Sequence, residues 1–342
     1  TSKNFIDWAY TNNKGKRVMY SVFNHGSGFD DLNETATFGI GFDDSNNGDS
    51  LSHKELAQVT SHIKGKAGKK IDLFFPYACL MGGIELAWEV KDNADYLLSS
   101  EEVFPAELWS YEALSSITDN PAISGEDLGK AICDDAYTFF SNPDIDRSLT
   151  LSLVDLSNLD PLYNALNAFA VQMTNWIGTD VAKARDLDYA AWSGLYMSTP
   201  YYADIGVFMA KVDSLLDETE SLTNPVRSAL DSAVVYKKNF TSSYYAGTPN
   251  ETRYDNACGL TIFHNIWDAQ YLNIEYDPSL YRSILTFGQN NAWGAYTQAL
   301  YDMTPPPPET GVEPDEYEPD GLSDTVVNIL SKGISAKQYH TF

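Results

Sequence analysis

The stretch FFPYACLMGG (residues 74–83) joins the end of an apolar run to a cysteine and two glycines. The run begins at Ile71, and its length, its aromatic content and its end at Pro76 are typical of a buried β-strand followed by a turn. Cys79 is therefore either a small buried residue or a thiol presented at the edge of a sheet.

A second apolar run, 18–23, ends just before His25 and Gly26. His25 lies 54 residues before Cys79, which leaves room for a long loop and a helix between two strands. The carboxyl ends of parallel strands meet at one edge of a sheet, so we expect the two side chains to lie close together. Each residue alone has a structural explanation, as a turn histidine or a buried cysteine. The pair at this spacing favours a catalytic site.

Cysteine and histidine together suit the cleavage of an acyl bond. A histidine can accept the thiol proton and later donate it to a leaving amine. Backbone N–H groups must face the carbonyl oxygen as it gains negative charge. We expect the N–H groups of Gly26 and Cys79 to form this oxyanion hole.

Further strands and helices alternate along the chain in the manner of a parallel sheet covered by helices. Ser52, followed by Glu55, predicts the capped start of a helix that precedes the cysteine strand. The remaining patterns predict strands at 94–102, 148–156 and 257–265, and helices at the N-terminus and at 81–92, 159–177, 203–217 and 223–238.

Composition narrows the possible partners. The 342 residues are 43% hydrophobic, enough for a substantial core, and carry a net charge of −26, which argues against nucleic acid and anionic membranes as partners. The three cysteines form no disulfide framework, and no apolar stretch could span a bilayer. Residues 43–50 (DDSNNGDS) have oxygen ligands at alternating positions but no closing acid for calcium, so a polar loop is the better interpretation.

Several segments resemble the clostripain family of cysteine peptidases, which shares the caspase-like fold. FNHGSGF (23–29) and ACLMGGIELAWEVKDNADYLLSSEE (78–102) resemble its His and Cys blocks, and KNFIDWAY, GDSLSHKEL and ACGLTIFHN resemble neighbouring elements. The resemblance is strong over about 1–110 and continues more weakly to about 303. It implies an α/β fold, a mostly parallel sheet flanked by helices, whose first strand and helix are missing from this chain.

The resemblance also implies the roles of the candidate residues. His25 would be the general base and acid, and Cys79 the nucleophile, in an endopeptidase that acts on peptides or proteins. No metal or organic cofactor is implied, and the sequence leaves a calcium requirement open. Family members are typically exported bacterial proteins, so we expect a periplasmic, cell-surface or secreted location.

The chain departs from the family at the substrate pocket. The family has Asp two residues before the nucleophile, where it receives an Arg or Lys side chain, but this chain has Tyr77. A phenol cannot form a charge-assisted pair with a guanidinium group. The family's Pro-Gly-x-Gly-Trp segment is also changed, to PAELW (105–109). We assign to the pocket Tyr77, Ser99, Ser100, Glu101 and Glu107, and an acid among Glu101, Glu102 and Glu107 could replace the missing Asp.

Three functions stay open at this point. The first is an endopeptidase whose preference has moved away from Arg and Lys, and the second is an Arg- or Lys-specific enzyme that uses a displaced acid. The third is a non-catalytic relative that acts as a binding protein, although such a protein has no chemical reason to keep both His25 and Cys79.

We expect a peptidase domain over 1–303 with a helical insertion at about 159–240. The Pro-rich, acidic segment 304–321 has the composition of a stiff linker, and we expect 322–342 to form a short tail with one further short helix.

Overall fold

The computed structural model describes residues 2–13, 15–28, 39–43, 45, 49–105, 112–193, 202–248, 252–264, 278–302, 329–331 and 334–336. Its internal contacts divide the chain into two compact units, Thr1–Met303 and Thr304–Phe342. No helix among these described residues has the length and apolarity needed to cross a membrane.

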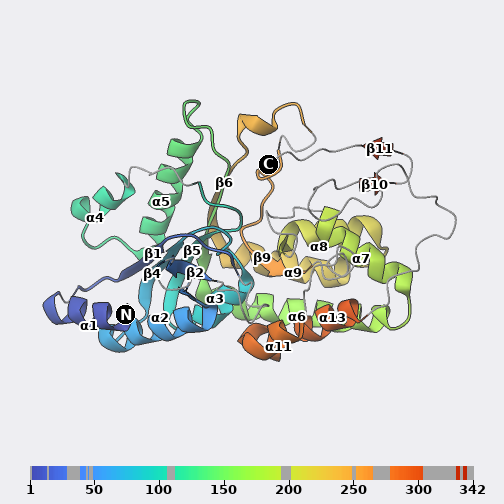
Figure 1. The fold of residues 1–342 in the computed structure, drawn as a ribbon, viewed down its shortest axis with the longest axis horizontal. Helices are drawn as coiled ribbons and strands as arrows, with labels where there is room; N and C mark the ends of the chain where they lie inside the picture. Colours follow the sequence, from blue (N-terminus) through green and yellow to red (C-terminus); the bar gives the residue numbers. More distant parts are fainter. Residues whose placement is uncertain are drawn as a thin grey trace. The chain divides into compact units, whose positions relative to one another are not determined.

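The larger unit alternates strands and helices (Figure 1). Its first half contains α1 (Ser2–Asn12), β1 (Met19–Phe23), β2 (Ile40–Asp43), β3 (Asp49–Leu51), α2 (His53–Ala67), β4 (Ile71–Tyr77), α3 (Ile84–Val90), β5 (Ala94–Ser100), η2 (Glu112–Leu114), α4 (Ser115–Asp119) and α5 (Gly125–Phe140). Its second half contains β6 (Leu149–Asp155), η3 (Leu156–Asn158), α6 (Leu159–Ile177), α7 (Val181–Ser193), β7 (Tyr202–Asp204), α8 (Ile205–Leu215), α9 (Glu220–Ala233), β8 (Val234–Phe240), η4 (Ser243–Tyr245), β9 (Thr261–Phe263), α11 (Pro278–Ile284), α12 (Thr286–Asn290) and α13 (Ala292–Tyr301).

Five strands form the central sheet in the order β1-β4-β5-β6-β8. β1 pairs with β4 in parallel, from Met19 opposite Leu73 to Phe23 opposite Tyr77, and β4 pairs with β5 in parallel. β6 runs antiparallel to both β5 and β8. The mostly parallel α/β sheet is thus confirmed, with the histidine and cysteine strands as neighbours.

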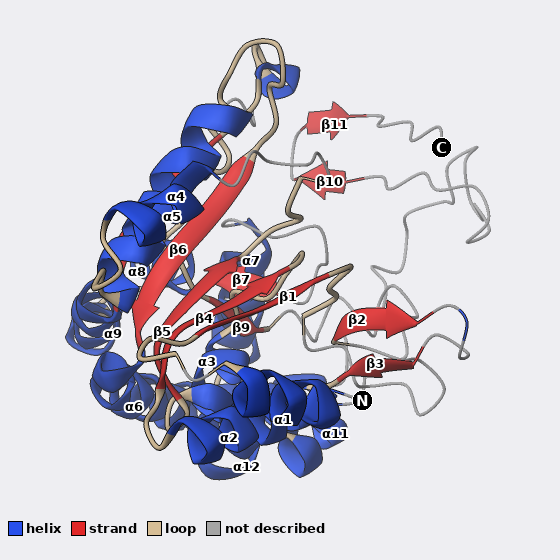
Figure 2. Ribbon diagram, turned by 90° about the vertical axis from the view of Figure 1, so that its left-hand side faces the viewer, coloured by secondary structure: helices blue, strands red, loops and turns tan. Residues whose placement is uncertain are grey.

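Helices cover both faces of this sheet, as Figure 2 shows. Every residue of β4 is buried, because alternate side chains enter different cores. Phe74 packs in a core with residues of α2, α3 and α6, whereas Phe75 and Tyr77 pack in a second core with residues of α5. A strand buried on both sides is rigid, and it ends immediately before Cys79.

The helix before β4 begins as its sequence predicts. The Ser52 side chain accepts a hydrogen bond from the backbone of Glu55, whose carboxylate in turn accepts the backbone N–H of Ser52. This capping box satisfies two N–H groups that the first helical turn leaves without partners. Gly68 ends the helix with φ of 70°, a conformation that favours glycine.

The structure differs from expectation at the end of the 159–240 segment. α6 has the predicted bounds, but the helical pattern expected up to 238 stops at Ala233, and β8 follows as an edge strand of the sheet. The sequence VVYKKNF begins with β-branched residues, and pairing with β6 decides its conformation. The late strand expected at 257–265 is β9, which pairs with β7 outside the main sheet.

The smaller unit contains one described pair of strands. β10 (Ile329–Ser331) and β11 (Ile334–Ala336) pair in antiparallel fashion, where the sequence suggested a helix. The proposed linker, 304–321, lies outside the described residues.

A buried carboxyl group ties the helix after Cys79 to two later elements. Glu85 of α3 accepts hydrogen bonds from the N–H of Phe263 in β9 and from the hydroxyl of Tyr281 in α11, each at 2.9 Å. The side chain is fully buried, and this burial raises the pKa of Glu85 from 4.5 to about 7 despite the two donors. The carboxyl group is therefore protonated in the folded protein at mildly acidic pH.

Glu85 makes the stability of the fold dependent on pH. Between pH 4.5 and about 7 the folded protein keeps this proton while the unfolded chain has lost it. The contribution of Glu85 to stability is therefore fully present below about pH 4.5 and falls as the pH rises to about 7. We expect the free energy of unfolding of Glu85→Gln to fall by up to about 3 kcal/mol less than that of the wild type over this pH range. Urea unfolding at several pH values, with the exposed Asp92→Asn as control, measures it. An unchanged pH dependence in Glu85→Gln would contradict the assignment.

Candidate active site

The register of β1 and β4 brings His25 and Cys79 to one edge of the sheet. Phe23 and Tyr77 are the last paired residues of the two strands, and each candidate follows two residues later. His25 is exposed, and its backbone N–H donates to the Asn24 side chain at 2.6 Å. The sequence prediction that the two side chains share one edge agrees with this register.

A tight turn holds Cys79 at the end of β4. Leu80 has φ of 60°, in the left-handed region that non-glycine residues seldom adopt. The end of β5 and the segment after it hold this turn, since Leu80 N–H donates to Glu102 O at 3.2 Å and Gly82 N–H donates to Ser100 O at 2.8 Å. Strain at a turn persists only where the surroundings fix it, and here two backbone hydrogen bonds do so.

The same segment contacts the thiol itself. The N–H of Phe104 donates to Cys79 Sγ at 3.3 Å. Partial burial raises the pKa of the Cys79 thiol, and the charge of Glu102 raises it further. Hydrogen bonds from the backbone N–H groups of Phe104, Cys79 and Gly26 lower it. The Phe104 N–H is thus a direct donor to the sulfur.

Gly26 approaches the cysteine more closely than any other residue type could. A Cβ at this position would lie 2.5 Å from Cys79 O and 2.8 Å from Ala78 Cβ, well inside normal contact distance. An isolated antiparallel bridge between Gly26 and Ile40 holds the glycine from the other side. The backbones of Gly26 and Cys79 therefore lie against each other.

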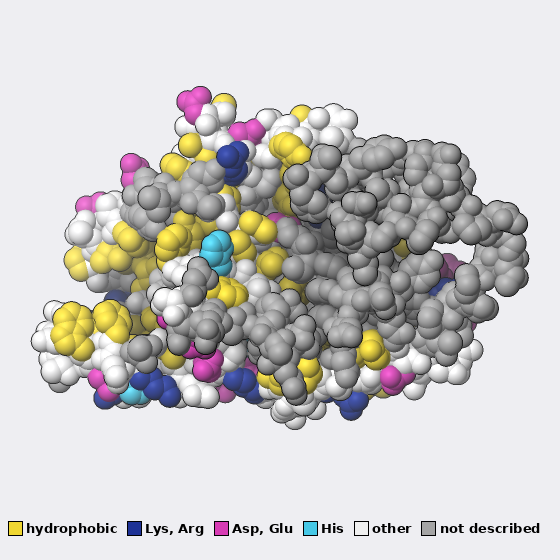
Figure 3. Space-filling model, viewed as in Figure 1, with side chains coloured by type: hydrophobic (Ala, Val, Ile, Leu, Met, Phe, Trp, Pro, Cys, Tyr) yellow, Lys and Arg dark blue, Asp and Glu magenta, His cyan; other side chains and the backbone are white. Residues whose placement is uncertain are grey.

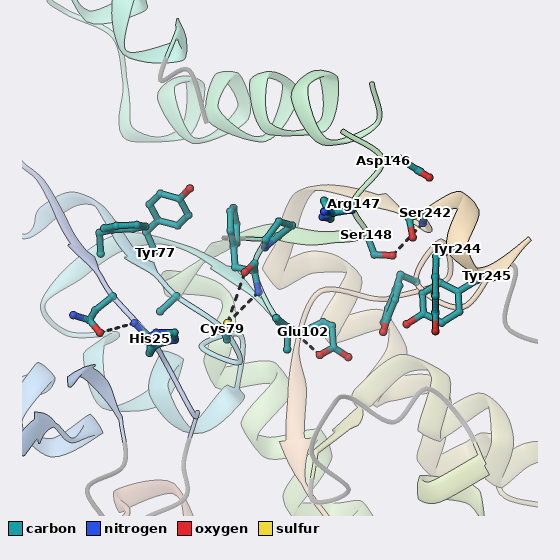
Figure 4. A pocket seen from close by; sticks show the side chains of 17 residues that line it. His25, Tyr77, Cys79, Glu102, Asp146, Arg147, Ser148, Ser242, Tyr244 and Tyr245 are labelled. Atoms are coloured by element: carbon teal, nitrogen blue, oxygen red, sulfur yellow. Dashed lines mark hydrogen bonds between the residues drawn. The ribbon is translucent and has the colours of Figure 1, made fainter. Parts of the chain in front are cut away.

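His25 and Glu102 flank the thiol. Figure 4 shows the imidazole on one side of Cys79 and the carboxylate on the other. Within the described residues, no hydrogen bond joins His25 to Cys79. Hydrogen bonds between a catalytic base and its nucleophile often tighten only when substrate binds, so the arrangement is compatible with proton transfer.

A cavity of about 950 Å³ opens over these residues. Figure 3 shows hydrophobic side chains gathered next to a histidine on one face of the molecule. The walls of the cavity are mainly apolar and aromatic, with a few charged groups. The residues that line it are Phe23, Asn24, His25, Tyr77, Ala78, Cys79, Glu102, Val103, Phe104, Pro105, Asp146, Arg147, Ser148, Ser242, Tyr244, Tyr245 and Tyr254. A cavity of this size and character can accept several side chains of a peptide.

Tyr77 forms part of an aromatic wall. Its ring packs edge-on against Phe104 at 4.6 Å between centroids, stacks on Phe75 at 5.2 Å and contacts Phe23 at 4.8 Å. The hydroxyl is directed away from Cys79 (Figure 4). The place where the family has an acid is thus apolar on the side of the nucleophile.

Three residues that we expected in the substrate pocket do not line this cavity. Ser99 and Ser100 are buried at the end of β5, where pairing with β6 covers them. Glu101 is buried below the turn, where it accepts the N–H of Gly259 at 2.9 Å. Burial raises the pKa of both Glu101 and Asp204, and the charge of Asp204 raises that of Glu101 further. Glu107 lies outside the described residues.

Several wall residues escaped the sequence analysis. Phe104 contacts the thiol because the segment after β5 returns along the Cys79 turn, and no local pattern signals that return. Arg147 and Tyr254 reach the cavity from the loops before β6 and after β8. Glu102 was considered only as one of three acids, and it is the one that the described structure places in the wall.

We find no metal site in the described parts of the chain, since no group of three or more His, Cys, Asp or Glu side chains could hold an ion there. In the 43–50 segment, the Asp43 carboxylate accepts hydrogen bonds from the backbone and side chain of Ser45. Residues 44 and 46–48 lie outside the described residues.

Comparison with known proteins agrees with this geometry. Residues 1–293 match the model of the clostripain family, Peptidase_C11. Solved structures with a similar fold include a secreted C11 cysteine protease from Bacteroides thetaiotaomicron, "iotapain" (TM-score 0.57, 20% identity, covering 86% of this chain and 76% of that one). Another is an inactive zymogen C11 protease from Parabacteroides distasonis (TM-score 0.56, 19% identity, covering 84% of this chain and 73% of that one).

A third similar structure is a secreted C11 cysteine protease from Bacteroides thetaiotaomicron in complex with an irreversible peptide inhibitor (TM-score 0.58, 16% identity, covering 84% of this chain and 76% of that one). No curated protein matches the chain at a significant level. At these identities the structural likeness shows the fold, and the family model shows the family.

The three thiols should differ in reactivity. Burial raises the pKa of all three, but Cys133 is fully enclosed and Cys258 lacks the backbone N–H donors that face Cys79. We expect iodoacetamide to modify Cys79 first in the native protein, Cys258 more slowly and Cys133 only after unfolding. Mass spectrometry of the alkylated peptides over time measures the order, with denatured protein as control. Faster labelling of Cys258 would contradict it.

Proposed function

Because the chain belongs to the clostripain family of cysteine peptidases, we propose that it cleaves peptide bonds with His25 and Cys79 as a catalytic dyad. One observation supports this assignment above the others. The backbone of Gly26 lies directly against that of Cys79, hydrogen bonding from both backbones lowers the pKa of the Cys79 thiol, and His25 lies beside the thiol at the carboxyl edge of the sheet. In the proposed site Cys79 supplies the nucleophile, His25 the base, and the N–H groups of Gly26 and Cys79 the oxyanion donors.

The first half of the reaction forms an acyl-enzyme. His25 accepts the proton of the Cys79 thiol, and the sulfur attacks the carbonyl carbon of the substrate. The carbonyl oxygen gains the negative charge, and the N–H groups of Gly26 and Cys79 stabilise it. The C–N bond then breaks, the amine leaves with the proton from His25, and a thioester remains on Cys79.

The second half releases the acid. His25 accepts a proton from water as the water attacks the thioester carbon, and the same N–H groups stabilise the new oxyanion. Cleavage of the C–S bond returns the proton to Cys79 and frees the new carboxyl terminus of the substrate. The reaction consumes one water molecule and requires no cofactor.

We propose a preference for an apolar or aromatic residue before the cut. The support is the wall at Tyr77, where three phenylalanine rings surround the phenol and no carboxylate stands in place of the family's Asp. The chain also has no Lys or Arg from Gly26 to His53, the segment in which the resemblance to the clostripain family implies a maturation cut after a basic residue. Glu102 in the wall of the cavity favours the alternative, an Arg- or Lys-specific enzyme with a displaced acid.

We also propose that the protein acts outside the cytoplasm. The support is family membership and the two similar structures described as secreted proteases. Fractionation of cells that produce the full-length protein tests this location.

The dyad predicts a separation of activity from stability. We expect Cys79→Ala to abolish peptide hydrolysis, since the nucleophile is lost, and His25→Ala to reduce it by at least about 100-fold. Both thermal midpoints should stay within about 2 °C of the wild type, because His25 is exposed and an alanine fits the space of the partly buried thiol. Hydrolysis of a peptide library and thermal unfolding measure the two properties. A silent His25→Ala combined with an unfolded Cys79→Ala would mean that Cys79 is structural.

The aromatic wall predicts the order of substrates. We expect acetylated fluorogenic peptides with Phe, Tyr or Leu before the cut to be hydrolysed faster than matched peptides with Arg or Lys, since a cation gains no charge-assisted bond beside Tyr77. Values of kcat/KM for the matched set measure the order, with Cys79→Ala as the blank. Faster hydrolysis of the Arg peptides would contradict this preference and support the displaced acid.

A further inference from the structure

Glu102 is a carboxylate fixed in the wall of the active-site cavity. Its residue is only 4% exposed, yet it lines the cavity that contains Cys79. One carboxylate oxygen accepts the N–H of Val103 at 2.7 Å. The backbone is held as well, since its N–H donates to Thr150 Oγ1 at 3.1 Å and its carbonyl oxygen accepts the Ser100 hydroxyl at 3.0 Å. The position of the charge is therefore set by the fold.

This charge acts directly on its surroundings in the cavity. The negative charge of Glu102 contributes to the raised pKa of Cys79 and to that of Tyr254. Two other charged groups line the cavity, Asp146 and Arg147, and they are neighbours of opposite sign. The Asp146 carboxylate is also bound by the backbone and side chain of Ser243. Glu102 is thus the wall carboxylate that acts on the thiol.

The charge of Glu102 opposes the first step of the proposed reaction. The nucleophile is the thiolate, and a nearby negative charge disfavours its formation. A cation beside the carboxylate would remove that effect and would itself gain a charge-assisted bond in a partly buried site. The net charge of −26 favours the approach of cations in general.

Glu102 and Tyr77 lie on different sides of the nucleophile. Figure 4 shows Tyr77 on the side of His25 and Glu102 on the opposite side of Cys79, towards Tyr245. A peptide that places one side chain on the aromatic wall at Tyr77 would therefore bring a different residue to Glu102. The two ends of the cavity offer two unlike subsites, one apolar and one anionic.

We propose that Glu102 is a specificity-determining residue that binds a basic side chain of the peptide substrate at a position other than the residue before the cut. The proposal rests on the proposed peptidase function for its substrate, but not for the electrostatic effect on Cys79. Binding of the ammonium or guanidinium group offsets the charge of Glu102, so that the thiolate forms more readily when a suitable peptide occupies the cavity.

The proposal has an electrostatic half, the effect of the Glu102 charge on Cys79, and a substrate half, the binding of a basic side chain. The electrostatic half is tested without any peptidase activity. Three methanethiosulfonate reagents of similar size, with a quaternary ammonium group, no charge or a sulfonate group, report the potential at the thiol through their rates of reaction with Cys79. We expect the cationic reagent to react at least about fivefold faster than the anionic one in the wild type, and Glu102→Gln to reduce this ratio by about fivefold. Mass spectrometry of the Cys79 peptide distinguishes it from Cys258.

Asp92→Asn is the matched control, because it removes one negative charge from a side chain that is 83% exposed. It should leave the ratio unchanged at 0.15 M salt, where distant surface charges are screened. Gln keeps an oxygen that can accept the N–H of Val103, and circular dichroism verifies the fold of each variant. Equal rates for the two charged reagents in the wild type, or equal effects of Glu102→Gln and Asp92→Asn, would overturn the electrostatic half.

The substrate half is tested with a library of acetylated peptides, in which no free amino terminus can supply the cation. We expect Lys or Arg to be enriched at one position flanking the cut, other than the residue before it, and Glu102→Gln to abolish that enrichment while cleavage continues. Enrichment that survives Glu102→Gln, or that falls on the residue before the cut, would overturn the proposal. If neither protein cleaves any peptide, the peptidase function and with it the substrate half fail, and the reagent ratio still decides the electrostatic half.

Discussion

Parallel pairing between β1 and β4 is the constraint from which the active-site geometry follows. The pairing ends with Phe23 opposite Tyr77, so the chain leaves both strands at the same edge and at the same height. Gly26 and Cys79 can then lie backbone against backbone, which leaves no room for a Cβ on the glycine. A shift of the pairing by one residue would turn every side chain of β1 to the other face and separate these groups.

The segment after β5 also holds Cys79 in place. It returns along the cysteine turn, holds Leu80 in its left-handed conformation and donates the Phe104 N–H to the sulfur. Thr150 of β6 fixes this segment through the N–H of Glu102. Cys79 is thus positioned by three successive strands of the sheet and not by its own loop alone.

The sequence was most informative where local patterns and tertiary structure agree. β4 is apolar throughout because both its faces are covered, and the Ser52 capping box marks its preceding helix without any tertiary information. It was least informative where pairing decides the outcome. β8 follows α9 with no turn signal, and the burial of Ser99 and Ser100 depends on β6, which lies about fifty residues further along the chain. Small hydroxyl residues after a strand suit a pocket and a covered edge equally well, so no pattern could separate the two.

Tyr77 also bears on how such a site can change during evolution. Its ring is enclosed by Phe23, Phe75 and Phe104, which together form one packed unit. A carboxylate introduced alone at this position would be desolvated by the three rings, at a cost of several kcal/mol. The acidic and aromatic forms of the pocket are therefore separated by a sequence of linked substitutions, in which the rings must recede before an acid is tolerated. Lineages on either side of that barrier would tend to keep the residue type at this position even when their overall sequences diverge widely.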